Sequence, residues 1–124
     1  HSLVDAFHAT LEAATDADVL LHVVDSASHA RDEQMAEVNK VLAEIGADRV
    51  PQVIVWNKID LTHAGPGVER DEYANIARVR VSARSGEGLG LLRETLAEIA
   101  LAKAESRRAA RADAAREAQH ETMD

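Results

Sequence analysis

Two short apolar runs constrain the fold of this chain more than any other feature. Residues 19–24 are apolar except for His22, and the predicted strand at residues 50–56 ends in the apolar run at residues 53–56. Runs of this kind are typical of parallel strands that are covered on both faces. The chain between them carries an apolar stripe at helical spacing, formed by Met35, Val38, Leu42 and Ile45. The order strand, helix, strand predicts a parallel α/β layer.

The remaining elements follow from weaker patterns. Residues 77–81 alternate apolar side chains with Arg78 and Arg80, which indicates a third strand with one buried face. Because this strand is the most polar, we expect it at an edge of the sheet. Residues 62–75 are predicted to be irregular with room for a short helix. Helices are predicted from residue 1 to about residue 14 and from Leu89 onward.

A polar tetrapeptide, Asn57-Lys58-Ile59-Asp60, follows the second apolar run directly. It has the pattern N-K-x-D, by which P-loop GTPases select guanine over adenine. The Watson–Crick edge of guanine presents two adjacent donors, and an ionised Asp offers two acceptor oxygens that can take both. We interpret Asp60 as the reader of the base, Lys58 as a side chain that lies along its face, and Asn57 as a tie between loops. The alternative is an ordinary polar exit from a strand.

A second motif strengthens this interpretation. The third predicted strand ends in Ser82-Ala83-Arg84, and S-A-[KR] after the next strand is the usual companion of N-K-x-D. There the backbone N–H of Ala83 can donate to the keto oxygen of guanine, and the Ser82 hydroxyl can orient the Asp60 carboxylate. Arg84 stands where Lys is common, which matters little if the backbone makes the contact. The two motifs together predict GTP or GDP as the ligand.

The motif that binds phosphates in such proteins is not found in the sequence. A phosphate loop has the pattern G-x-x-x-x-G-K-[ST], and none of the six glycines precedes a Lys. The glycine-rich segment at 86–90 is interpreted as a flexible entry into the last helix. We therefore predict no catalytic residue in this chain, and no hydrolysis of GTP by the chain alone.

Composition excludes several other functions. The formal net charge of −8 argues against a general binder of nucleic acid or of anionic membranes. No apolar stretch approaches the roughly 20 residues that span a bilayer, and the absence of cysteine excludes thiolate metal sites. The histidines form no ligand pair, and His22 is interpreted as a core or sheet-face residue. We expect a cytoplasmic protein with no metal site in this chain, no membrane partner and no direct sequence-specific contact with nucleic acid.

Asp25, at the end of the first apolar run, raises one rival for the site. Phospho-receiver domains share this scaffold, but they need an acidic pair near the first strand to hold magnesium, and the sequence lacks it. We therefore interpret Asp25 as a strand terminator whose carboxylate bonds to its own loop. Residues 103–124 are rich in alanine with balanced charges. They are predicted to be a solvent-facing helix or a disordered tail.

Several segments together resemble the HflX family of ribosome-associated P-loop GTPases. They are the opening pattern H-x-L-V-x-A-F-x-x-T-L at residues 1–11, the strand L-L-H-V-V-D at residues 20–25, and residues 41–46 and 51–61. The resemblance covers about residues 1–100. It assigns guanine binding to six residues: Asn57, Lys58, Asp60, Ser82, Ala83 and Arg84.

The resemblance also implies a fold class and a parent protein. The fold would be a partial P-loop GTPase, a Rossmann-like three-layer α/β sandwich with about three parallel strands and flanking helices. Residues 1–102 would be the C-terminal half of its G domain, and residues 103–124 a tail. The parent would bind GTP with magnesium held by ligands outside this chain, hydrolyse GTP, associate with the large ribosomal subunit and split stalled ribosomes. The chain begins at His rather than Met, and we expect it to be part of such a longer protein.

In that fold the strand at 19–24 pairs with the strand that leads into the phosphate loop, so one of its edges would be unpaired here. The competing hypothesis is a non-catalytic α/β interaction module that keeps the scaffold and has lost nucleotide binding.

Overall fold

The computed structural model describes Asp5 and residues 12–122 of the chain. It contains two compact units, His1–Arg93 and Glu94–Asp124, which are described separately. The helix predicted from residue 1 to residue 14 lies largely outside the described residues, and the described chain at its end is a 3-10 helix, η1 (Glu12–Asp16). Within the described residues, no helix combines the length and the apolar character that crossing a membrane requires.

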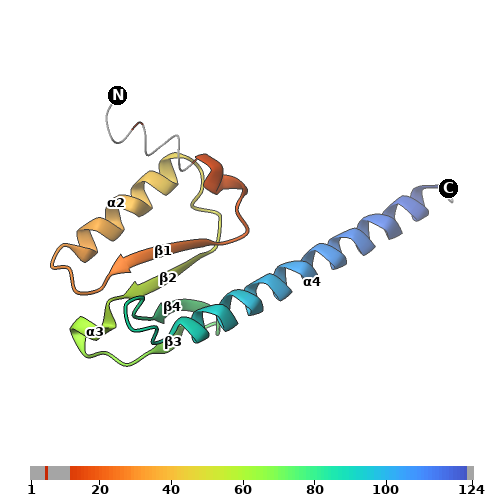
Figure 1. Ribbon diagram of the computed structural model, residues 1–124. Coiled ribbons are helices and arrows are strands. Elements are labelled where there is room, and N and C mark those ends of the chain that lie inside the picture. The colour runs from red at the N-terminus through yellow and green to blue at the C-terminus, as the bar shows by residue number, and fades with distance from the viewer. Residues whose placement is uncertain (1–4, 6–11, 123–124) are drawn as a thin grey trace. The chain divides into compact units, whose positions relative to one another are not determined.

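The first unit is built on one mixed sheet (Figure 1). Its strands are β1 (Leu20–Asp25), β2 (Gln52–Asn57), β3 (Gly67–Arg70) and β4 (Ile76–Arg80), in the spatial order β1-β2-β4-β3. β1, β2 and β4 are parallel, and each matches a predicted strand to within about two residues. The predicted α/β fold with parallel strands is therefore confirmed.

The prediction that the third parallel strand lies at an edge is wrong. β4 lies inside the sheet, because β3 pairs with it in the antiparallel direction on its outer side. β3 itself arises in the segment that was predicted to be irregular. The arginines of β4 are not solvated edge residues, because both form ion pairs with Glu69 of β3. The nitrogen–oxygen distance is 3.0 Å for Arg80 and 3.9 Å for Arg78.

Helices connect and cover the strands. α2 (Arg31–Glu44) joins β1 to β2 and packs on one face of the sheet through Leu42, which is buried. A one-turn helix, α3 (Ile59–Thr62), follows β2 and overlaps the N-K-x-D tetrapeptide. α4 (Leu89–Thr122) starts in the first unit and forms the second, in which residues 105–121 are all exposed. The segment predicted to be a helix or a disordered tail is thus helical as far as Thr122.

Burial changes sharply across the sheet. Val23, Val55 and Val79 are register partners on the same face of β1, β2 and β4. Val55 and Val79 are buried, whereas Val23 is 63% exposed. The core of the first unit is therefore centred under β2 and β4, and β1 lies at its margin.

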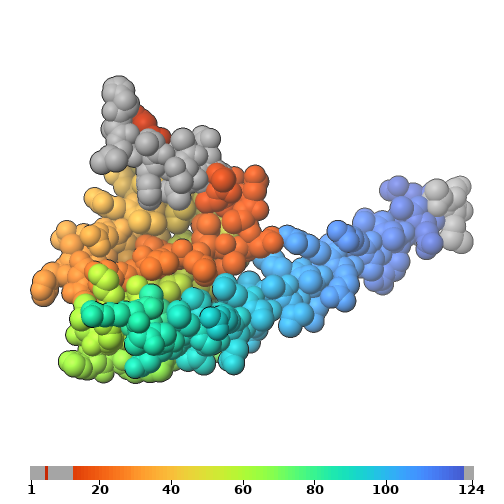
Figure 2. Space-filling model, viewed as in Figure 1, coloured from red at the N-terminus to blue at the C-terminus, as the bar shows by residue number. Residues whose placement is uncertain are grey.

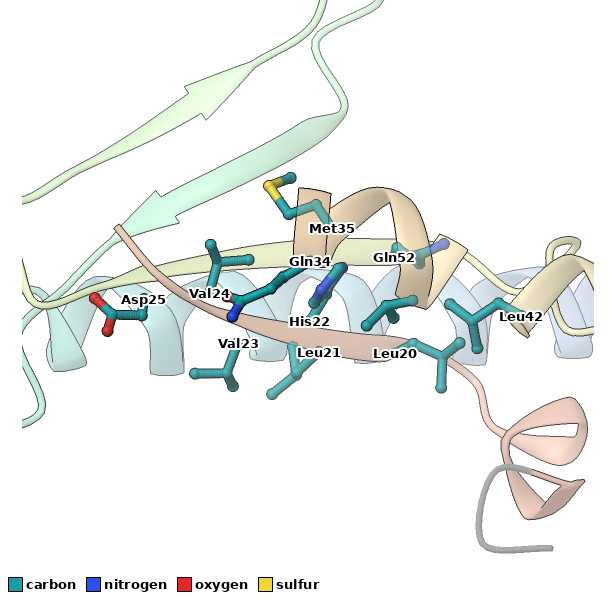
Figure 3. Close-up of a pocket in the computed structure, with 11 residues that line it drawn as sticks. Leu20, Leu21, His22, Val23, Val24, Asp25, Gln34, Met35, Leu42 and Gln52 are labelled. Atoms are coloured by element: carbon teal, nitrogen blue, oxygen red, sulfur yellow. The ribbon is translucent and has the colours of Figure 1, made fainter. Parts of the chain in front are cut away.

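The outer side of β1 has no strand beside it in the described part of the chain. A hollow of about 310 Å³ opens there, lined by β1 and α2. Figure 3 shows His22 and Val24 on the side of β1 that faces α2, and Leu21 and Val23 on the opposite side. Partial burial lowers the pKa of His22, which favours the neutral imidazole expected of a sheet-face histidine.

Candidate nucleotide-binding site

Two loops at the carboxyl ends of β2 and β4 carry all six predicted guanine-binding residues. Asn57 is the last residue of β2, and Ser82 follows β4 by two positions. Because β2 and β4 are parallel neighbours, with Trp56 opposite Arg80, the loops leave the sheet side by side. Ligands of open α/β sheets bind outside the carboxyl ends of the strands.

The first loop is anchored by its one apolar residue. Ile59 is 1% exposed, and its backbone N–H donates to the carbonyl of Val81 at 3.2 Å. Lys58, just before it, has a left-handed backbone with φ of 69°. A non-glycine residue in this conformation is held there by its surroundings. The buried Ile59 leaves its neighbours Lys58 and Asp60 on the exposed side of the loop.

Ser82 connects the second loop to the first. Its side chain is fully buried, and its hydroxyl donates to Asp60 Oδ1 at 2.8 Å. Ser82 Oγ in turn accepts the backbone N–H of Ser85 at 3.1 Å. A serine hydroxyl has one proton to donate, so these two bonds fix its orientation and direct the proton at the carboxylate. This is the Ser82–Asp60 contact expected from the sequence.

Asn57 ties the two loops together, as its motif predicts. The backbone N–H of Ala83 donates to Asn57 Oδ1 at 2.9 Å. This is also the N–H that the sequence assigned to the keto oxygen of guanine. An N–H can be shared between two acceptors, so the guanine contact of Ala83 stays a prediction. Arg84, the next residue, is exposed.

The carboxyl end of β1 enters the site through its last residue, Asp25. One of its carboxylate oxygens accepts the backbone N–H of Ala27 at 3.0 Å, which confirms the predicted bond to its own loop. The other oxygen forms an ion pair with Lys58 Nζ at 2.8 Å, and this contact was not predicted. The hydrogen bond from Lys58 is the main reason that the pKa of Asp25 is lowered. A carboxyl group of this kind stabilises the fold above its unfolded pKa and loses that contribution as the pH falls through its folded pKa.

Ser26 was also missed by sequence reasoning. It is fully buried, and both its backbone N–H and its hydroxyl donate to the carbonyl oxygen of Asn57. A single serine in a polar loop gives no sequence signal that could have found it. Its effect is to fasten the β1 loop to the start of the N-K-x-D loop.

A GTPase site also needs ligands for magnesium. Among Asp5 and residues 12–122, no three His, Cys, Asp or Glu side chains gather in a way that could hold a metal ion. We therefore assign no magnesium ligand to the described residues.

Comparison with known proteins defines the class first. The model of the ADP-ribosylation factor family matches residues 12–99, which include all three loops of the site. The chain therefore belongs to this family of GTPase domains.

Curated relatives then narrow the class to the HflX GTPases, to which the chain belongs. It is 43% identical over 99 residues to "GTPase HflX" of Escherichia coli, covering 79% of this chain and 23% of that protein. It is 43% identical over 97 residues to "GTPase HflX" of Caldanaerobacter subterraneus (77% and 21%). For "GTPase HflX" of Spirochaeta thermophila the identity is 44% over 93 residues (74% and 22%). The chain thus spans between 21% and 23% of the length of these relatives.

Proposed function

We propose that this chain supplies the guanine-selecting part of a GTP-binding site in an HflX-type GTPase. The observation that supports this most is the hydrogen bond from the buried hydroxyl of Ser82 to Asp60 Oδ1. It orients an exposed carboxylate at the mouth of two adjacent loops. A carboxylate held in this way can accept the ring N–H and the exocyclic amine of guanine together.

Each residue of the two loops has a proposed role in holding the base. Asp60 reads the edge of guanine, and Lys58 lays its alkyl stem along the face of the ring. Asn57 sets the spacing of the loops through its bond to the Ala83 N–H. The Ala83 N–H is also the proposed donor to the keto oxygen, and Arg84 borders the site on its exposed side.

The rest of the reaction is assigned to chain outside these residues. We propose that a phosphate loop and the magnesium ligands lie elsewhere in the protein, and that residues 1–102 form the C-terminal half of its G domain. GTP hydrolysis, association with the large ribosomal subunit, splitting of stalled ribosomes and a cytoplasmic location are proposed for the whole protein. These proposals are supported by membership of the HflX family, not by a contact within this chain.

Asp60→Asn tests the proposal in the longest natural protein that contains these residues. The substitution turns one acceptor oxygen into a donor that faces a donor on guanine. It should weaken GDP binding by about 2–4 kcal/mol, measured by isothermal titration calorimetry. Xanthosine diphosphate carries a carbonyl in place of the exocyclic amine, and it should bind the variant better than it binds the unsubstituted protein.

Asp48→Asn is a matched control, because Asp48 is an exposed aspartate on the loop before β2. It should leave the affinities for both nucleotides unchanged. Unaltered GDP binding in the Asp60 variant would remove the base-reading role. It would favour the alternative of a non-catalytic interaction module that has lost nucleotide binding.

A further inference from the structure

The charged end of Lys58 is held by a residue from outside both guanine motifs. Lys58 Nζ lies 2.8 Å from Asp25 Oδ2. This contact joins the residue after β2 to the last residue of β1. We infer that Asp25 is a positioning residue, which holds the Lys58 side chain in the extended form that stacks on the base. This inference rests on the proposed function, since it concerns how the same guanine site is prepared.

The strand register places Asp25 where it can do this. β1 and β2 are parallel neighbours, and Asp25 lies opposite Asn57, the residue before Lys58. The left-handed backbone of Lys58, with φ of 69°, fixes the direction in which its side chain leaves the loop. The bond from the Ala27 N–H to Asp25 Oδ1, at 3.0 Å, limits rotation of the carboxylate. Both partners of the ion pair are therefore oriented by the backbone.

The loop that follows Asp25 is itself fastened to the N-K-x-D loop. The buried Ser26 donates twice to the carbonyl oxygen of Asn57. On its other side, Arg31 of α2 donates from Nη1 to the carbonyl of Ser26 at 2.8 Å. Asp25 and Lys58 thus keep their spacing because neighbouring backbone groups are bonded to each other.

Positioning matters because a lysine stem is flexible. A free lysine side chain visits many rotamers, and freezing it when a base arrives weakens binding. The ion pair restricts the stem beforehand. The side chains of Lys58 and Asp25 are 48% and 37% exposed, so solvent screens the pair. Exposed pairs have small effects, and we expect a change in affinity of about two- to fivefold.

Asp25→Asn separates positioning from the structural role of the loop. Asparagine keeps an oxygen that can accept the Ala27 N–H, but it presents an amide in place of the charge that faces Lys58. Asp25→Ser serves as a second variant, because a serine hydroxyl can also accept that loop bond. Asp48→Asn is the matched control, since Asp48 is an exposed aspartate on the loop before β2.

The experiment measures the dissociation constant of GDP in the longest natural protein that contains these residues. Asp25→Asn and Asp25→Ser should each raise it about two- to fivefold, and Asp48→Asn should leave it unchanged. The same substitutions are then made together with Lys58→Met. Methionine keeps an unbranched apolar stem without the charge, so binding should remain measurable. In this background the Asp25 substitutions should have no effect.

Several results would overturn the inference. An unchanged dissociation constant in both Asp25 variants would do so, as would the same increase with and without Lys58→Met. Loss of a cooperative thermal transition in both variants would make Asp25 a purely structural residue. Loss of measurable binding in Lys58→Met alone would make the charge, and not the placement of the stem, the determinant. If Asp60→Asn also left GDP binding intact, the proposed function itself would fail, whereas an effect of Asp60→Asn alone would remove only the role of Asp25.

Discussion

The two edges of the sheet are built in opposite ways. At one edge, β3 is only four residues long, it runs antiparallel to β4, and its register slips between Glu69 and Arg70. At the other edge, β1 is six residues long, regular and apolar at four of its six positions. Short, irregular and charged edge strands discourage pairing with other chains, whereas long apolar edges invite it.

The charged edge is also internally satisfied. Glu69 of β3 pairs with both arginines of β4, and the guanidinium of Arg78 lies 3.9 Å from the centre of the Trp56 ring. At the tip of the hairpin, Asp71 Oδ1 accepts the backbone N–H groups of Tyr73 and Asn75. The charged side chains of this edge are therefore paired within the hairpin.

The β1 edge lacks any such protection in the described residues. Leu21 and Val23 are 42% and 63% exposed, and the chain of β1 reaches the surface of the first unit in the space-filling view (Figure 2). The sheet thus ends in a short, charged strand at β3 and in a longer, more apolar strand at β1. Similar valines on one face of the sheet should consequently differ in what they contribute.

The largest expected difference lies between Val79 and Val23, which face the same side of the sheet. Val79→Ala, at a fully buried position, should lower the free energy of unfolding of the 124-residue chain by about 2–3 kcal/mol. Val23→Ala should lower it by less than about 1 kcal/mol, since little burial is lost. Urea titration followed by circular dichroism measures both, and equal losses would contradict the contrast between centre and edge.

The next effect concerns association of the isolated chain with itself. We expect the chain to self-associate through β1, and Val23→Lys to raise the dissociation constant of that association about tenfold or more, or about 1.4 kcal/mol. Sedimentation velocity over a range of concentrations measures this. Leu101→Lys is the control, because Leu101 is 62% exposed on a helix and offers no strand edge. A chain that stays monomeric at every concentration would show that β1 needs no partner.

The smallest effect is expected at the charged edge. Arg78→Gln removes the nearer of the two guanidinium groups over the Trp56 ring, an interaction that contributes about 0.5–1 kcal/mol when partly exposed. The loss should appear in the same urea titration. Arg49→Gln, at an exposed loop arginine, should change the stability less. If the two arginine variants were equivalent, the ring contact would contribute nothing to this edge.

The parallel part of the fold could be predicted because its signal is local. Continuous apolar runs mark strands that are buried on both faces, and β1 and β2 appear where the runs are. β3 could not be predicted in this way, since Val68 is the only large apolar residue among its four. It is a strand because β4 pairs with it and because Glu69 meets two arginines, and both are tertiary effects that override local preference. The same contacts explain why a polar strand lies inside the sheet.

The contacts of the site also divide into those that the sequence could predict and those that it could not. The bonds from Ser82 to Asp60 and from Ala83 to Asn57 join residues of two recognisable motifs, so the motifs were enough to expect contact between the loops. The pair of Asp25 and Lys58 belongs to no such pattern. It depends on the register of β1 against β2 and on the left-handed backbone conformation of Lys58. Neither can be read from the order of residues.

The hairpin has a further consequence for the kinetics of folding. Gly67 pairs with Arg80 and Arg70 with Ile76, so β3 and β4 meet after closing a short loop. β1 and β2 can pair only after the whole of α2 has been accommodated between them. Local pairings form faster than distant ones, so we expect the hairpin to form early and β1 to join late. Stopped-flow measurements of the folding rate would check this order. Val68→Ala should slow folding more than Val23→Ala. β1 would then be the last strand of the sheet to become ordered. Its apolar edge would stay exposed to other chains during most of the folding time.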